Sequence, residues 1–88
     1  MAKTIDYWTA VWCQPCKSLK PKVQALCDRY GWTLIEHDFD DPSMHHVAVT
    51  LGIQSVPTLY MRANDELKIL TGSTANPLNV KRMMVKYD

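Results

Sequence analysis

The sequence predicts an α/β fold in which a four-stranded mixed sheet carries helices on both faces. Three observations support this fold: strands and helices alternate over the first two thirds of the chain, a turn then joins two strands into a hairpin, and a capped helix follows. The expected element order is β-α-β-α-β-β-α. Because 88 residues suffice for one compact domain, we expect residues 1–88 to form a single domain.

The first strand is expected between Ile5 and Val11, where residues that favour strands are concentrated. Beyond the Cys-Gln-Pro-Cys segment, apolar residues recur at helical spacing and predict a helix over Gln14 to Tyr30, which Gly31 can end. The apolar face of this helix comprises Leu19, Val23, Leu26 and Tyr30.

The remaining elements follow the same logic. Trp32 to Phe39 predicts a strand, Pro42 to Gly52 a helix, and Val56 to Met61 a third strand, and we expect these helix-linked strands to run parallel. A turn at Ala63-Asn64-Asp65 returns the chain as an antiparallel strand over Glu66 to Thr71. The last helix is expected to have Asn76 as its cap, Pro77 in its first turn, and a buried face of Val80, Met83, Met84 and Tyr87.

Composition and charge narrow the function classes. Hydrophobic residues make up 47% and charged residues 22% of the chain, which is typical of a globular protein. A formal net charge of +1 provides no broad field for nucleic acid or an anionic membrane. Asp6 lies where a signal peptide would have an uninterrupted apolar run. No segment of the sequence approaches the roughly 18 consecutive apolar residues of a membrane-spanning helix. We therefore expect a cytoplasmic protein.

Cys13 and Cys16 are the candidate catalytic pair. With Cys13 at the start of the helix, Cys16 lies one turn further in, so the two sulfurs can close a short disulfide. Unpaired N–H groups at a helix start favour a thiolate, which is the attacking species in disulfide exchange. Cys13 is the expected nucleophile, and the less exposed Cys16 is expected to resolve the mixed disulfide. Lys17 can add positive charge beside the pair.

The segment Trp12-Cys13-Gln14-Pro15-Cys16-Lys17 resembles the active site of thioredoxins. Pro21 resembles the helix-kinking proline of that family, Val56-Pro57-Thr58 its cis-proline segment, and Gly72 the glycine after its hairpin. The resemblance covers nearly the whole chain and begins after the family's first strand and helix. It implies a thioredoxin fold, a cis Val56–Pro57 bond, and a substrate site formed by the Trp12 ring and the backbone of Val56 beside Pro57.

One position departs from that family, whose members usually keep a buried aspartate on the strand before the active site to assist proton transfer to the inner cysteine. Without gaps, that position holds Tyr7, and Asp6 then points to the opposite face of the strand. A bulge would instead bring Asp6 into the aspartate position. We favour the ungapped alignment because Trp8-Thr9-Ala10-Val11-Trp12 resembles an aromatic-Thr-Ala-x-Trp pattern of thioredoxin-like proteins.

The cysteines, histidines, lysines and aspartates also have simpler, non-catalytic interpretations. The cysteine pair could be half of a zinc site completed by His37, His45 or His46, but a second Cys-x-x-Cys is missing from the sequence and we expect no metal. Cys27 lies about 16 Å along the helix from Cys16, beyond disulfide reach, and is expected to be a semi-buried apolar residue. Lys20 and Lys22 are expected on a solvated helix face, and Asp38, Asp40 and Asp41 in a solvated loop.

The expected function is thiol-disulfide exchange by a protein-disulfide reductant that needs no bound cofactor. The thioredoxin resemblance implies a thioredoxin reductase as electron donor, protein disulfides such as that of ribonucleotide reductase as acceptors, and a monomer. A glutaredoxin fed by glutathione is the first alternative, although the Gly-Gly pair of such proteins does not follow the hairpin. The second alternative is a binding module that uses the Trp12 and Pro57 surface without turnover.

Overall fold

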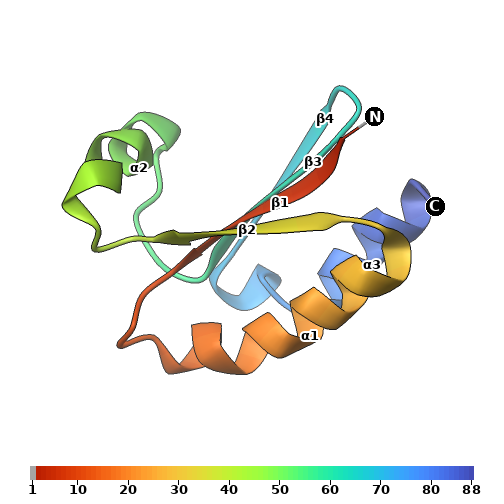
Figure 1. Ribbon diagram of the computed structural model, residues 1–88, viewed down its shortest axis with the longest axis horizontal. Helices are drawn as coiled ribbons and strands as arrows, with labels where there is room; N and C mark the ends of the chain where they lie inside the picture. The colour runs from red at the N-terminus through yellow and green to blue at the C-terminus, as the bar shows by residue number, and fades with distance from the viewer. Residues whose placement is uncertain (1) are drawn as a thin grey trace.

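The computed structural model describes residues 2–88, and its elements follow the predicted order (Figure 1). In the first part of the chain these are strand β1 (Lys3–Thr9), helix α1 (Gln14–Tyr30) and strand β2 (Thr33–Asp38). A 3₁₀ turn (Pro42–Met44) then leads into helix α2 (His45–Leu51). The last part comprises strands β3 (Thr58–Ala63) and β4 (Glu66–Thr71), a second 3₁₀ turn (Gly72–Thr74) and helix α3 (Pro77–Lys86).

The four strands form one mixed sheet in the order β2-β1-β3-β4, which confirms the predicted fold class. β1 pairs in parallel with β2, whereas β3 is antiparallel to both β1 and β4. The expectation that the third strand runs parallel to the first is therefore wrong. The seven residues of α2 reach only about 10 Å at 1.5 Å per residue, too short to run back along the sheet. The chain therefore enters β3 near the end of β2 (Figure 1).

The helix and strand ends show how local sequence sets the elements. α1 has the predicted bounds and ends at Gly31, whose φ of 76° is left-handed and whose N–H donates to the Cys27 carbonyl at 2.9 Å. α3 begins after Asn76, whose side chain accepts the Asn79 N–H at 2.9 Å. The helical segment expected over residues 42–52 begins at Pro42 after the Asp41 cap and ends at Gly52, but its first turn, Pro42–Met44, is 3₁₀ rather than α.

The two faces of the sheet are covered differently. On one face, α1 and α3 lie against each other and against alternate residues of β1, Ile5 and Tyr7 (Figure 1). On the other face, α2 covers only one end of the sheet, where a smaller cluster comprises Trp8, Ala48, Ile53 and Tyr60. The prediction of helices on both faces is confirmed. Within residues 2–88, each helix is too short or too polar to cross a membrane.

Candidate active site

The loop after β1 delivers Cys13 to the start of α1. The Cys13 N–H donates to the Ala10 carbonyl at 3.0 Å, and Cys13 itself is the N-cap of the helix. Pro15 lies in the first turn, where its missing N–H costs little. Cys16 follows one turn later, and the two cysteines are joined by a disulfide with 5.3 Å between their Cα atoms, an ordinary separation for such a bond.

The helix start places a backbone N–H next to the Cys13 sulfur. The Cys16 N–H donates to Cys13 Sγ at 3.2 Å, as expected of an N-cap side chain. When the disulfide is reduced, the same N–H and the helix dipole favour negative charge on Cys13 Sγ. Cys13 is 3% exposed and Cys16 is completely buried, so Cys13 is the more accessible of the two.

Trp12 and the segment before β3 differ in exposure and in packing. Trp12 is 62% exposed, and its indole N–H donates to Asp40 Oδ2 at 2.5 Å. Val56 packs against the core cluster that contains both cysteines, and the Val56–Pro57 peptide bond is cis. Pro57 is buried and precedes β3 directly. Val56 thus packs against the same core cluster to which both cysteines belong.

Tyr7 occupies the face of β1 beneath the active site. Its hydroxyl donates to the Cys16 carbonyl at 2.7 Å, and its side chain is fully buried in the core under α1. Burial, and to a smaller extent the charge of Glu36, together raise the pKa of Tyr7 from 10.0 to about 12. At neutral pH, Tyr7 is therefore a protonated hydrogen-bond donor.

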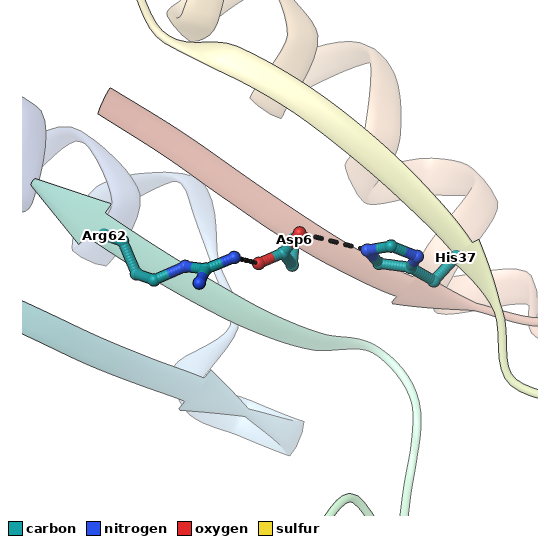
Figure 2. Close-up of polar contacts among 3 residues, drawn as sticks. All are labelled: Asp6, His37 and Arg62. Atoms are coloured by element: carbon teal, nitrogen blue, oxygen red, sulfur yellow. Dashed lines mark hydrogen bonds and ion pairs between the residues drawn. The ribbon is translucent and has the colours of Figure 1, made fainter. Parts of the chain in front are cut away.

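Asp6 lies on the opposite face of β1, as the ungapped alignment predicts. Its two carboxylate oxygens are shared between His37, whose Nε2 is 3.0 Å from Oδ1, and the guanidinium of Arg62, which pairs with Oδ2 (Figure 2). The His37 ring also stacks on Trp8 with 4.7 Å between ring centroids. Asp6 therefore belongs to a polar cluster on the face away from the cysteines.

A groove of about 610 Å³ reaches Cys16 from the side of β2. Its lining includes an ion pair between Lys20 of α1 and Glu36 of β2, with 2.9 Å between Nζ and Oε2. Lys20 lies one helical turn beyond Cys16, and Glu36 is the register partner of Tyr7 across the β1 and β2 pair. These residues form a charged rim beside the buried cysteine.

Sequence reasoning missed the parts played by three residues. Asp40 and Lys20 were expected to be merely solvated, yet Asp40 holds the Trp12 indole and Lys20 holds Glu36. The spacing of Lys20 four residues after Cys16 places both on one side of the helix, which was a usable signal. Glu36 carried no such signal, because its position beside Tyr7 depends on the pairing of β1 with β2.

The other candidate residues stand apart from the site. Cys27 is completely buried, so the expectation of a semi-buried residue is wrong, and burial raises its pKa from 9.0 to about 11. On α1, the buried face is Cys16, Leu19, Val23 and Cys27. His45 and His46 are exposed on α2, and within residues 2–88 His, Cys, Asp and Glu side chains do not gather in a group of three that could hold a metal ion.

Comparison with known proteins identifies the family. The family model described as thioredoxin matches residues 2–84. Thioredoxin of Gallus gallus is 37% identical over 73 residues, which cover 82% of this chain and 66% of that protein. Thioredoxin of Mus musculus is 31% identical over 84 residues, covering 94% of this chain and 76% of that protein. The chain thus spans about two thirds to three quarters of the length of these relatives.

Solved structures agree with the sequence relatives. Oxidised thioredoxin O1 of Arabidopsis thaliana superposes with a TM-score of 0.85 at 26% identity, over 97% of this chain and 77% of that one. Oxidised thioredoxin of Plasmodium falciparum gives a TM-score of 0.74 at 30% identity, over 97% of this chain and 80% of that one. Together with the Cys13 and Cys16 disulfide at the start of α1, these matches show that the chain belongs to the thioredoxin family of thiol-disulfide oxidoreductases.

Proposed function

We propose that this protein is a dithiol reductant of protein disulfides in which Cys13 attacks and Cys16 resolves. The observation that carries the proposal is the N-cap geometry, in which the Cys16 N–H donates to Cys13 Sγ at 3.2 Å. A thiolate at this position is stabilised by the helix start, and Cys13 is the more accessible of the two cysteines. Cys16, completely buried one turn further in, then displaces the product from Cys13.

The proposed substrate surface comprises the exposed Trp12 ring and the backbone of Val56 beside Pro57. Trp12 supplies apolar area whose orientation is held by Asp40. Val56 lies against the core cluster that contains the cysteines, so an extended substrate segment paired with its backbone would pass close to Cys13. As donor and acceptors we propose a thioredoxin reductase and protein disulfides such as that of ribonucleotide reductase, with the protein acting as a cytoplasmic monomer.

Insulin-disulfide reduction tests the proposed roles. Cys13→Ser should abolish reduction and form no mixed disulfide, whereas Cys16→Ser should abolish turnover and accumulate a mixed disulfide at Cys13 that mass spectrometry detects. Cys27→Ala is the matched control, because Cys27 lies on the same helix outside the site, and it should retain activity. Full activity in Cys13→Ser would refute the proposal.

The direction of electron flow requires a separate measurement. Equilibration against glutathione should give a reduction potential near the roughly −270 mV of a reductant, whereas a value near −120 mV would indicate an oxidant. Turnover should depend on a thioredoxin reductase with its nicotinamide donor. Equal turnover with glutathione alone would favour a glutaredoxin role, and partner binding that survives replacement of both cysteines would favour a binding module.

A further inference from the structure

Resolution of a mixed disulfide requires a group that takes the proton of Cys16. Cys16, in the first turn of α1, is completely buried on the core side of the helix, and burial among apolar groups holds a thiol in its neutral form. The thiolate is the attacking species, so the proton has to leave before or during attack. The position that the family resemblance reserves for an acid holds Tyr7, and the question is which group takes over.

Two residues of β1 can be set aside by geometry. The Tyr7 hydroxyl already donates to the Cys16 carbonyl at 2.7 Å and keeps its own proton at neutral pH. Asp6 projects from the other face of the strand, where both of its oxygens are engaged by His37 and Arg62 (Figure 2). Tyr7 is therefore a positioning residue for the first turn of α1, and Asp6 is separated from the thiol by the sheet.

The groove beside Cys16 offers other groups. Its charged lining comprises Lys17 and Lys20 from α1, Glu36 and Asp38 from β2, and Asp41 from the following loop. The lysines are cations with no acceptor site. Asp38 Oδ1 accepts the Asp40 N–H at 2.9 Å, and Asp41 Oδ1 accepts the N–H and hydroxyl of Ser43, so both carboxylates hold local turns.

Glu36 has a different environment from the two aspartates. It is the register partner of Tyr7, which places it on the α1 side of the sheet, and Lys20 holds its Oε2 at 2.9 Å. Its side chain is 43% exposed, so it can exchange protons with bulk solvent. Its charge helps to raise the pKa of Tyr7, the residue whose hydroxyl donates to the Cys16 carbonyl. A charged groove of about 610 Å³ that is lined by both Cys16 and Glu36 has room for water to bridge polar groups several ångströms apart.

We propose that Glu36, held by Lys20, is the group that accepts the Cys16 proton through water in the groove during the resolving step. This inference rests on the proposed function, in which Cys16 resolves a mixed disulfide at Cys13. The proton of Cys16 is thus accepted by a residue of the neighbouring strand β2, on the solvent side of the thiol. Tyr7 of β1 instead fixes the backbone of the helix turn that carries Cys16.

The resolving step moves one proton and one electron pair. The Cys16 S–H proton passes through water to the Glu36 carboxylate, and the Cys16 sulfur attacks Cys13 Sγ. The Cys13–Cys16 bond forms while the bond between Cys13 and the substrate sulfur breaks. The substrate sulfur leaves with the electron pair and takes a proton from solvent. The dithiol is oxidised by two electrons and the substrate disulfide is reduced by the same two.

The two chemical steps can be separated with dithiobis(nitrobenzoate), which releases one coloured thiolate at each step. In reduced protein carrying Cys27→Ala, a first phase reports attack by Cys13 and a second phase reports resolution by Cys16. Glu36→Gln should slow the second phase about tenfold at neutral pH, less than the 10²–10⁴-fold of direct general-base contact because the proton passes through water. The first phase should change less than about twofold.

The direction of the effect separates proton acceptance from simple charge. Removing a negative charge near a thiol favours the thiolate, so a Glu36 that acts only through its field predicts a faster second phase in Glu36→Gln. The wild-type second phase should vary little with pH around neutrality, whereas that of Glu36→Gln should rise about tenfold per pH unit because solvent must take the proton. Glu36→Asp should recover most of the rate. An unchanged or faster second phase in Glu36→Gln would overturn the inference.

Two control variants sharpen the assignment. Glu66→Gln breaks a matched surface ion pair, Lys86 to Glu66 at 2.9 Å, on β4 and α3 and should leave both phases unchanged. Asp38→Asn removes a charge from the same groove and should not slow the second phase; slowing there instead would assign the role to Asp38 and refute Glu36. Absence of the first phase in the wild type would refute the proposed function itself, which distinguishes the two failures.

Discussion

Asp6 and Tyr7 are neighbours on β1 but lie in opposite environments. Tyr7 faces α1, buried in a core that contains both cysteines, and donates to the Cys16 carbonyl. Asp6 faces the side that α2 leaves partly uncovered and shares its charge with His37 and Arg62 (Figure 2). A carboxylate one residue away in sequence is therefore remote from a thiol when a sheet separates them.

Tyr7→Ala should be the most damaging change. It removes a fully buried ring from the core under α1, and such truncations cost about 3–5 kcal/mol in the free energy of unfolding. Urea denaturation of the oxidised protein measures this loss. A cost no greater than that of Asp6→Ala would contradict the contrast between the two faces.

Alkaline pH should reveal the buried hydroxyl of Tyr7. The pKa of Tyr7 in the folded protein, about 12, lies above the 10.0 of an exposed tyrosine. The contribution of the Tyr7 hydroxyl to the free energy of unfolding is therefore complete below about pH 10 and is lost as the pH rises toward 12. Two pKa units correspond to about 3 kcal/mol. Cys27 should contribute similarly between about pH 9 and 11.

Urea denaturation of the oxidised protein across this alkaline range measures the effect. Tyr7→Phe should flatten the upper part of the pH dependence of the free energy of unfolding, between about pH 10 and 12. Cys27→Ala should flatten the lower part, between about pH 9 and 11. Asp6→Ala should change neither part, since Asp6 lies on the opposite face of β1 from Tyr7. If the pH dependence of Tyr7→Phe matches that of the wild type, the buried hydroxyl is not its source.

Asp6→Ala should cost about 1–2 kcal/mol in the free energy of unfolding, because it leaves the partly buried His37 without its carboxylate partner. Since Asp6 lies away from the cysteines, its loss should alter insulin-disulfide reduction less than about twofold. Urea denaturation and the reduction rate, measured on the same preparation, check both statements. A large loss of reduction with little loss of stability would place Asp6 in the proton path after all.

Arg62→Gln should have the smallest effect. The Arg62 side chain is 56% exposed, and ion pairs of exposed side chains contribute about 0–1 kcal/mol. We expect a change below about 1 kcal/mol in the free energy of unfolding, diminished further in high salt. A loss that equals that of Asp6→Ala would mean that Arg62, rather than His37, is the principal partner of Asp6.

Much of the fold follows from local sequence. α1 and β4 have the predicted bounds, because helical periodicity, Gly31 and the turn before β4 act over a few residues. The predicted direction of β3 was wrong, because strand direction depends on how far the short helix α2 carries the chain before β3 begins. That outcome depends on the placement of several elements rather than on local sequence.

The candidate site divides in the same way. Sequence alone was sufficient for the cysteine pair and its place at a helix start, because helix caps are local properties, and it favoured without settling the side of β1 that Tyr7 occupies. The positions of Glu36 beside Tyr7, of Lys20 against Glu36 and of Asp40 against Trp12 became known only from the folded structure. Those contacts join elements that are distant along the chain, and the pairing of β1 with β2 brings them together.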